Sequence, residues 1–217
     1  MTGLSASLYA ADPLRLEEEI GAVAPYVESF HLDIMDGVFA PEYGLSGRLV
    51  GDVRRVTDRP LDVHLMVGEP RGAILRYAEA GVRSIAVHVE GETDFSEAAA
   101  IVRANGVQLL AAIRHTTPVA RLQDVAEIVD GIMFMTAPLG GGAFDDNAFL
   151  RLAGRPRHLP TTVDGRIEAS HFRRLSDLGV DLAVLGAALF AGGRAAETAR
   201  LYATELAGPG LASDSTS

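Results

Sequence analysis

The sequence predicts an α/β protein that forms a single (β/α)8 barrel, the TIM barrel. Short apolar runs that suit strands alternate with amphipathic helical patterns along the 217-residue chain. Eight such runs can be counted, which is the strand number of this fold. Prolines open several helical patterns and glycines close them, as in Thr117-Pro118 and Ala80-Gly81. We expect one barrel domain over residues 1–207, and the small, polar residues 208–217 are typical of a disordered tail.

The expected elements follow one another in regular order. Strands are expected at Ser5–Tyr9, Phe30–Asp36, Leu61–Met66, Ser84–Val89, Val107–Ile113, Gly131–Thr136, His158–Asp164 and Asp181–Gly186. Helical patterns cover Leu14–Ile20, Arg71–Ala80, Phe95–Ala104, Val119–Val129 and Glu168–Leu178. An open, doubly wound sheet is the alternative. It would place a nucleotide loop after the first strand, where Tyr9-Ala10-Ala11-Asp12 offers no glycine to hold a pyrophosphate.

Composition excludes several classes of function. The net charge is −10 without a basic block, which argues against nucleic acid or an anionic membrane as partner. No apolar run approaches the ~20 residues of a bilayer span, and the N-terminus has no secretory pattern, so we expect a cytoplasmic protein. The chain has no Cys, which excludes disulfides and thiolate chemistry. It also has no Lys, which excludes Schiff-base catalysis.

Several strands carry polar residues where a buried strand should be apolar. The stretch HLDIMDG, from His31 to Gly37, alternates polar groups and a methionine with Leu32 and Ile34, and three later strands repeat the pattern. In a closed barrel the aliphatic residues pack outward under helices, and the alternate residues meet near the axis, at the carboxyl ends of the strands. The residues expected to point inward are His31, Asp33, Met35, His64, Met66, His88 and Asp164.

Two histidines and two carboxylates in this inward set suit a divalent metal ion. His31, Asp33, His64 and Asp164 could supply four ligands; Zn(II) is expected first, and Fe(II), Mn(II) or Co(II) suit the same ligand types. Without a cation, two neighbouring carboxylates would repel each other. The alternative is that each histidine is a hydrogen-bonded core residue. That alternative has most weight for His88, which Glu90 or a backbone carbonyl could satisfy.

The motifs resemble the ribulose-phosphate 3-epimerase family. They occur in the family's order and spacing, and the resemblance runs from about Ser5 to Phe190. The matching stretches are Ala6-Ser7-Leu8, HLDIMDG, Pro60-Leu61-Asp62-Val63-His64-Leu65-Met66, Val87-His88-Val89-Glu90, Thr162-Val163-Asp164-Gly165 and Val184-Leu185-Gly186.

The resemblance implies a metal-dependent epimerase of a ketose phosphate, such as ribulose 5-phosphate and xylulose 5-phosphate. It implies that His31, Asp33, His64 and Asp164 bind the metal. Asp33 and Asp164 would also be the acid/base pair, one removing the C3 proton to give a cis-enediolate and the other protonating the opposite face. It further implies a homo-oligomer, a dimer or a hexamer, whose partner is a small sugar phosphate.

The same resemblance assigns residues that contact the substrate. Ser7 matches a substrate-contacting serine. Met35, Met66 and Met135 match methionines beside the sugar carbons, for which barrel packing is an alternative or additional role. Around the phosphate, the candidates are Gly141, Gly142, Gly165, Arg166, Gly186 and Ala187.

The phosphate end departs from the family pattern. The loop after the sixth strand is shorter and lacks a glutamine, Arg166 replaces a glycine, and Ala187 offers no hydroxyl. Either Arg166 binds the phosphate directly, or the substrate is a different ketose phosphate or a sugar with another anion. Arg166 and Arg114 could also be plain surface charges.

Two other functions compete with epimerisation. One is a non-catalytic barrel that keeps the metal site and only binds a ligand. The other is a metal-dependent aldolase or decarboxylase. Retention of both Asp33 and Asp164 favours proton transfer on two faces over either alternative.

Overall fold

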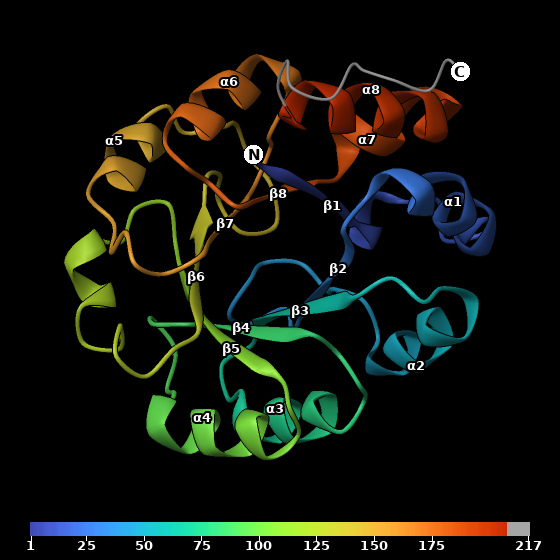
Figure 1. Ribbon diagram of the computed structural model, residues 1–217. Helices are drawn as coiled ribbons and strands as arrows, with labels where there is room; N and C mark the ends of the chain where they lie inside the picture. Colours follow the sequence, from blue (N-terminus) through green and yellow to red (C-terminus); the bar gives the residue numbers. More distant parts are fainter. Residues whose placement is uncertain (208–217) are drawn as a thin grey trace, which may run out of the picture.

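The computed structural model describes residues 1–207, in which eight parallel strands close into a barrel in sequence order. The strands are β1 (Gly3–Ser7), β2 (Ser29–Met35), β3 (Leu61–Met66), β4 (Ser84–His88), β5 (Gln108–Ile113), β6 (Gly131–Met135), β7 (Thr161–Asp164) and β8 (Leu182–Leu185). Figure 1 looks down this barrel and shows the helices as a ring around it. The predicted (β/α)8 barrel is confirmed, while the predicted disorder of residues 208–217 concerns residues outside those described.

The outer ring is built from helices of unequal length. They are α1 (Leu16–Val23), α2 (Gly47–Val56), α3 (Arg71–Ala78), α4 (Phe95–Ala104), α5 (Ala148–Ala153), α6 (Ala169–Asp177), α7 (Ala187–Phe190) and α8 (Ala195–Ala207). Short 3-10 turns complete the connections: η1 (Leu8–Ala10), η2 (Ala24–Tyr26), η3 (Val119–Leu122) and η4 (Ala191–Gly193). Among residues 1–207, no helix combines the length and the apolar character that crossing a membrane requires.

Two predicted elements differ from the structure. The first strand ends at Ser7, because Leu8–Ala10 turns into η1 and closes with a hydrogen bond from Ala11 N–H to Leu8 O. The helix expected over Val119–Val129 is only the 3-10 turn η3 followed by further turns. This segment is rich in β-branched residues, which disfavour a helix, and its Arg121 donates to the Val89 carbonyl.

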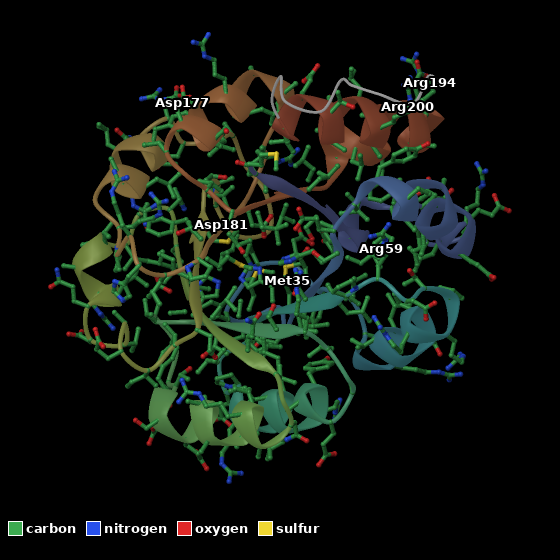
Figure 2. The ribbon with its side chains drawn as sticks, in the orientation of Figure 1. Met35, Arg59, Asp177, Asp181, Arg194 and Arg200 are labelled. Atoms are coloured by element: carbon green, nitrogen blue, oxygen red, sulfur yellow. The ribbon has the colours of Figure 1, made fainter. Side chains whose placement is uncertain are left out.

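The core divides into an outer and an inner part, as the strand pattern predicts. Outward residues of the strands, such as Leu32, Val63 and Val163, pack with helix residues in one continuous cluster. Inside the barrel, Ala86, Ala112 and Met133 form a small separate cluster. Figure 2 shows Met35 near the middle of the barrel, while Asp177 and Arg194 lie at its rim.

Candidate active site

Strand register brings the polar residues of the sequence pattern together. Asp33 on β2 pairs with His64 on β3, and His31 lies beside Ser7 on β1. On the other side of the mouth, Met135 on β6 pairs with Asp164 on β7. Because all strands are parallel, these positions share the carboxyl end of the barrel.

The predicted metal ligands form one compact group. One donor atom from each of His31, Asp33, His64 and Asp164 lies within 4.8 Å of the others. His31 Nε2 is 3.2 Å from Asp33 Oδ1 and 3.6 Å from Asp164 Oδ2. His64 Nδ1 faces the same two carboxylates at 3.3 and 3.5 Å. Four donors from three strands thus converge on one point.

His31 provides a test of whether this group suits a metal ion. The side chain is fully buried, yet neither Nδ1 nor Nε2 has a hydrogen-bond partner among the described residues. Nε2 lies close to both carboxylates without pointing along a hydrogen bond to either. A buried nitrogen without a partner is costly, and coordination of a cation between the carboxylates would satisfy it. The residues present therefore fit a divalent metal ion.

The charges of the group also call for a cation. Burial alone would raise the pKa of Asp33, but the nearby histidines, first His31 and then His64, lower it below its usual range. Burial opposes protonation of His31, yet Asp33 and Asp164 raise its pKa well above the ordinary value. The same carboxylates raise the pKa of His64 against burial. Two ionised carboxylates in one buried group thus demand compensating positive charge.

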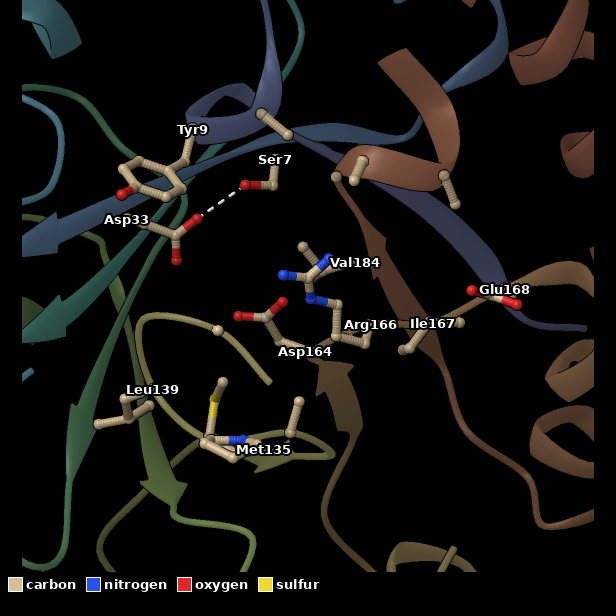
Figure 3. A pocket seen from close by; sticks show the side chains of 18 of the residues that line it. Ser7, Tyr9, Asp33, Met135, Leu139, Asp164, Arg166, Ile167, Glu168 and Val184 are labelled. Carbon is tan, nitrogen blue, oxygen red and sulfur yellow. Dashed lines mark hydrogen bonds between the residues drawn. The ribbon is translucent and has the colours of Figure 1, made fainter. Parts of the chain in front are cut away.

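Ser7 holds one of the carboxylates in place. Its hydroxyl donates a 2.7 Å hydrogen bond to Asp33 Oδ2, which is drawn as a dashed line in Figure 3. The other oxygen, Oδ1, is the one that faces the two histidines. Ser7, which was predicted to contact the substrate, therefore also orients the Asp33 carboxylate.

His88 lies next to this group without belonging to it. Its Nε2 is 2.9 Å from His64 Nε2, and its Nδ1 is 3.0 Å from Glu90 Oε2. Burial lowers the pKa of His88 to about 4 despite the nearby Glu90 carboxylate. Burial would raise the pKa of Glu90, but hydrogen bonds, first from His88, lower it to about 2. His88 is thus neutral and Glu90 ionised at neutral pH.

A cavity of about 740 Å³ opens above the carboxylates. Most of the predicted substrate-contacting residues line it, namely Ser7, Met35, Met66, Met135, Gly141, Gly165, Arg166, Gly186 and Ala187. Asp33 and Asp164 line it too, whereas His31 and His64, the two histidines predicted as metal ligands, and Gly142 do not. The cavity also includes Tyr9, Leu139 and Val184, which sequence analysis missed. Val184 could have been found from its place near the end of β8, and Tyr9 from its place just after the first strand.

The loop after β7 has an unusual backbone that aims Arg166 at this cavity. Gly165 has φ +120°, and a Cβ there would come within 2.7 Å of Ala137 N. Arg166 has φ +54°, a conformation that is rare for a residue with a side chain. Figure 3 shows the Arg166 side chain beside Asp164 among the lining residues. Within residues 1–207 its guanidinium has no ion pair or hydrogen bond, so its charge is available to a ligand.

Arg114, the other arginine in question, has a different place. Its guanidinium carbon lies 4.2 Å from the centre of the Phe39 ring, and Nη2 donates to the Phe39 carbonyl. It does not line the cavity. Arg114 therefore holds the loop after β2 and is not a surface charge.

Comparison with known proteins identifies relatives over most of the chain. The model of the ribulose-phosphate 3 epimerase family matches residues 3–190. Ribulose-phosphate 3-epimerase of Treponema pallidum is 29% identical, over 87% of this chain and 91% of its own length. The enzyme of that name from Bacillus subtilis is also 29% identical, over 88% and 93% of the two chains.

Solved structures agree on the fold. KGPDC from Streptococcus mutans has a TM-score of 0.80 at 10% identity and covers 95% of this chain and 97% of its own. A 3-hexulose-6-phosphate synthase has a TM-score of 0.70 at 16% identity and covers 94% and 98%. At such low identities, these matches support the barrel architecture alone.

A closed parallel barrel with paired carboxylates and histidines at its carboxyl end, together with these relatives, defines an enzyme of the isomerase class. The chain belongs to the ribulose-phosphate 3-epimerase family.

Proposed function

We propose that this chain is a metal-dependent 3-epimerase of a ketose phosphate, with ribulose 5-phosphate and xylulose 5-phosphate as the first substrate pair to test. The observation that carries the proposal is the pair of carboxylates, buried Asp33 on β2 and partly buried Asp164 on β7, with donor atoms within 4.8 Å in one compact group. The names of the relatives support the substrate class.

The two carboxylates have the properties of a base and its partner acid. A lowered pKa favours the ionised form of each carboxyl group, in which it can accept a proton from a sugar carbon. Both line the cavity, and β2 and β7 are separated by β1 and β8 in the barrel. One carboxylate removes the proton from C3, which leaves an enediolate. The other carboxyl group, which carries a proton from solvent when the substrate binds, gives that proton to the opposite face of C3, and the two groups exchange roles in the reverse reaction.

His31, Asp33, His64 and Asp164 would hold one divalent cation. When bound, the cation stabilises the negative charge that develops on a sugar oxygen beside the reacting carbon. A C–H next to a ketone is otherwise too weak an acid for a carboxylate. Zn(II) is the first choice for this ligand set, with Fe(II), Mn(II) and Co(II) as alternatives.

The methionines supply an apolar wall for the reacting carbons. Met35 and Met66 pack with buried Ala40, and the partly buried residues Phe39 and Leu139 pack against them. Met135 lines the cavity beside Asp164. Their thioethers keep water from the enediolate, which limits loss of the intermediate. Packing and substrate contact are therefore compatible roles.

Arg166 is the proposed partner of the phosphate. Its guanidinium can bind a phosphate through two hydrogen bonds. Gly141 is close by, since a Cβ there would be 3.6 Å from Arg166 Nη2. Gly165, Gly186 and Ala187 line the same cavity, while Gly142 does not line it and is less suited to this role. The substitution of a glycine by arginine is compatible with a ketose phosphate other than the pentose pair.

Deuterium incorporation tests the proposal. The metal-loaded protein is incubated in deuterated water with ribulose 5-phosphate and a panel of other ketose phosphates, and the products are followed by NMR. We expect the C3 epimer of one substrate to form with solvent deuterium at C3. Conversion without deuterium would contradict the two-base route. Absence of turnover with every ketose phosphate would favour a non-catalytic barrel that binds another sugar or anion.

A further inference from the structure

A chain of polar contacts runs from the metal-ligand group, past the end of β4, to the loop after β5. His64 Nδ1 faces the carboxylates, and its other nitrogen, Nε2, is 2.9 Å from His88 Nε2. His88 Nδ1 is 3.0 Å from Glu90 Oε2. The second oxygen of Glu90 accepts a 2.8 Å hydrogen bond from the backbone N–H of Arg114. Every member of this chain is thus tied to the next, and its end is fixed to the backbone of the loop after β5.

The protons in this chain can be assigned in order, starting from Glu90. A carboxylate only accepts, so His88 Nδ1 carries a hydrogen. An uncharged imidazole carries a single ring hydrogen, and the His88 side chain is buried, so with that hydrogen at Nδ1 its Nε2 keeps a lone pair that accepts. The hydrogen between the two Nε2 atoms therefore belongs to His64. A neutral His64 that is protonated at Nε2 has its lone pair at Nδ1, on the side of Asp33 and Asp164.

Packing prevents water from replacing these partners. His88 is 2% exposed, and its ring lies 5.1 Å from the ring of Phe39, centre to centre. The Arg114 guanidinium also lies over the Phe39 ring and donates to the Phe39 carbonyl. The rings of His64 and His88 are stacked, with centres 5.0 Å apart. His64 is itself fully buried, so His88 is the acceptor that the fold supplies to its Nε2.

We propose that Glu90, acting through His88, holds His64 in the tautomer that directs the Nδ1 lone pair at the carboxylate group, so that His64 can bind a metal ion. His88 and Glu90 are positioning residues, since neither reaches the cavity. Fixing a histidine ligand through its second nitrogen typically changes metal affinity by about 10- to 100-fold. The inference rests on the proposed function only in assuming that the metal takes part in catalysis. The His64 tautomer itself can be measured without any turnover.

The tautomer is tested directly by long-range ¹H–¹⁵N NMR on the ¹⁵N-histidine-labelled full chain. Spectra are recorded with zinc and, without metal, at alkaline pH where the histidines are neutral. We expect His64 to be protonated at Nε2 and His88 at Nδ1 in both states. A His64 protonated at Nδ1 in the metal-free protein would overturn the proposal, whether or not any variant folds.

Variants test the effect on the metal. His88→Leu removes the acceptor for His64 Nε2–H and is expected to weaken zinc binding about 10- to 100-fold, as measured by chelator competition. His88→Gln can place an amide oxygen near the same point and is expected to recover part of that loss. Glu90→Gln allows the amide to donate to His88 and reverse the chain, so that a second His64 tautomer is expected in the spectra.

Matched controls are available nearby. Glu92→Gln changes an exposed carboxylate two residues from Glu90, and His158→Gln changes an exposed histidine; neither is expected to alter zinc affinity. Folding of each variant is checked by its circular dichroism spectrum. Unchanged zinc affinity in folded His88→Leu would overturn the proposal. A protein with the expected tautomer and zinc affinity but no turnover would instead contradict the proposed function alone.

Discussion

Ser7 and Asp33, on neighbouring strands, share a 2.7 Å hydrogen bond that leaves only one oxygen of Asp33 facing the histidines. Ser7→Ala removes this bond to a charged group, which is worth about 1.5–3 kcal/mol. We expect kcat/KM to fall about 10- to 100-fold with little change in metal content. Steady-state kinetics and elemental analysis measure both. Ser176→Ala, at an exposed serine of α6, is the control, and kinetics in Ser7→Ala equal to that control would refute the orienting role.

Asp164→Asn tests the second carboxylate. An amide cannot accept the C3 proton, so we expect epimerisation to fall by at least about 10²–10⁴-fold, the usual contribution of a general acid or base. The fold should persist, because asparagine has the same shape. Turnover and the melting temperature are compared with Asp177→Asn, a change at an exposed carboxylate of α6. Near-normal turnover in Asp164→Asn would remove this residue from the mechanism.

His64→Ala tests the metal ligands. We expect the purified variant to contain much less metal than the wild type by elemental analysis. Zinc at 100 times its dissociation constant should stabilise the wild type by about 2.7 kcal/mol, which raises its melting temperature. The variant should show little such rise. Full metal content, or an equal thermal shift in both proteins, is the result that contradicts a ligand role for His64.

Arg166→Ala tests the anion partner. Loss of the guanidinium should raise KM for a phosphorylated ketose and weaken competitive inhibition by inorganic phosphate, each about tenfold or more, since a charge-assisted bidentate contact is lost. Because the proposed contact of Arg166 is with the end of the substrate remote from C3, kcat should change less than KM. Arg173→Ala, at an exposed arginine of α6, controls for net charge. If phosphate inhibits the two variants equally, Arg166 does not bind the anion.

Gly165→Ala tests the backbone that carries Arg166. The φ of +120° is unfavourable for alanine, and its Cβ would collide with Ala137 N at 2.7 Å. We expect a loss of about 1–3 kcal/mol in the free energy of unfolding, measured by denaturant titration. Gly51→Ala in α2 meets nothing within 4 Å and should instead stabilise the protein by about 0.5–1 kcal/mol. Equal effects of the two changes would contradict this account of the loop.

The sequence predicted the barrel and the inward group because both depend on a simple period. Alternation in HLDIMDG separates Leu32, which packs under the helices, from Asp33, which reaches the mouth. Because β2 and β3 are consecutive and parallel, Asp33 and His64 lie side by side at the same end of the barrel. The same alternation indicated that His88 points inward, and Glu90 was correctly considered as its partner.

Other features depend on contacts that no local pattern encodes. The 3-10 turn at Leu8–Ala10 replaces two expected strand residues. The helix expected after Pro118 shortens to η3, although its apolar spacing resembles that of a helix. The sequence grouped Gly142 with Gly141 as a phosphate contact. Both glycines have a positive φ, and only Gly141 of the two lines the cavity. Arg114 lies against Phe39, a partner 75 residues away along the chain.

The most direct test of the central claim is anomalous X-ray diffraction at the zinc edge from a crystal soaked with a ketose phosphate that the enzyme turns over. We predict one strong peak within about 2.0–2.2 Å of donor atoms from His31, Asp33, His64 and Asp164, with the sugar C3 between the Asp33 and Asp164 carboxylates. A peak away from these four residues, or both carboxylates on one face of the sugar, would contradict it.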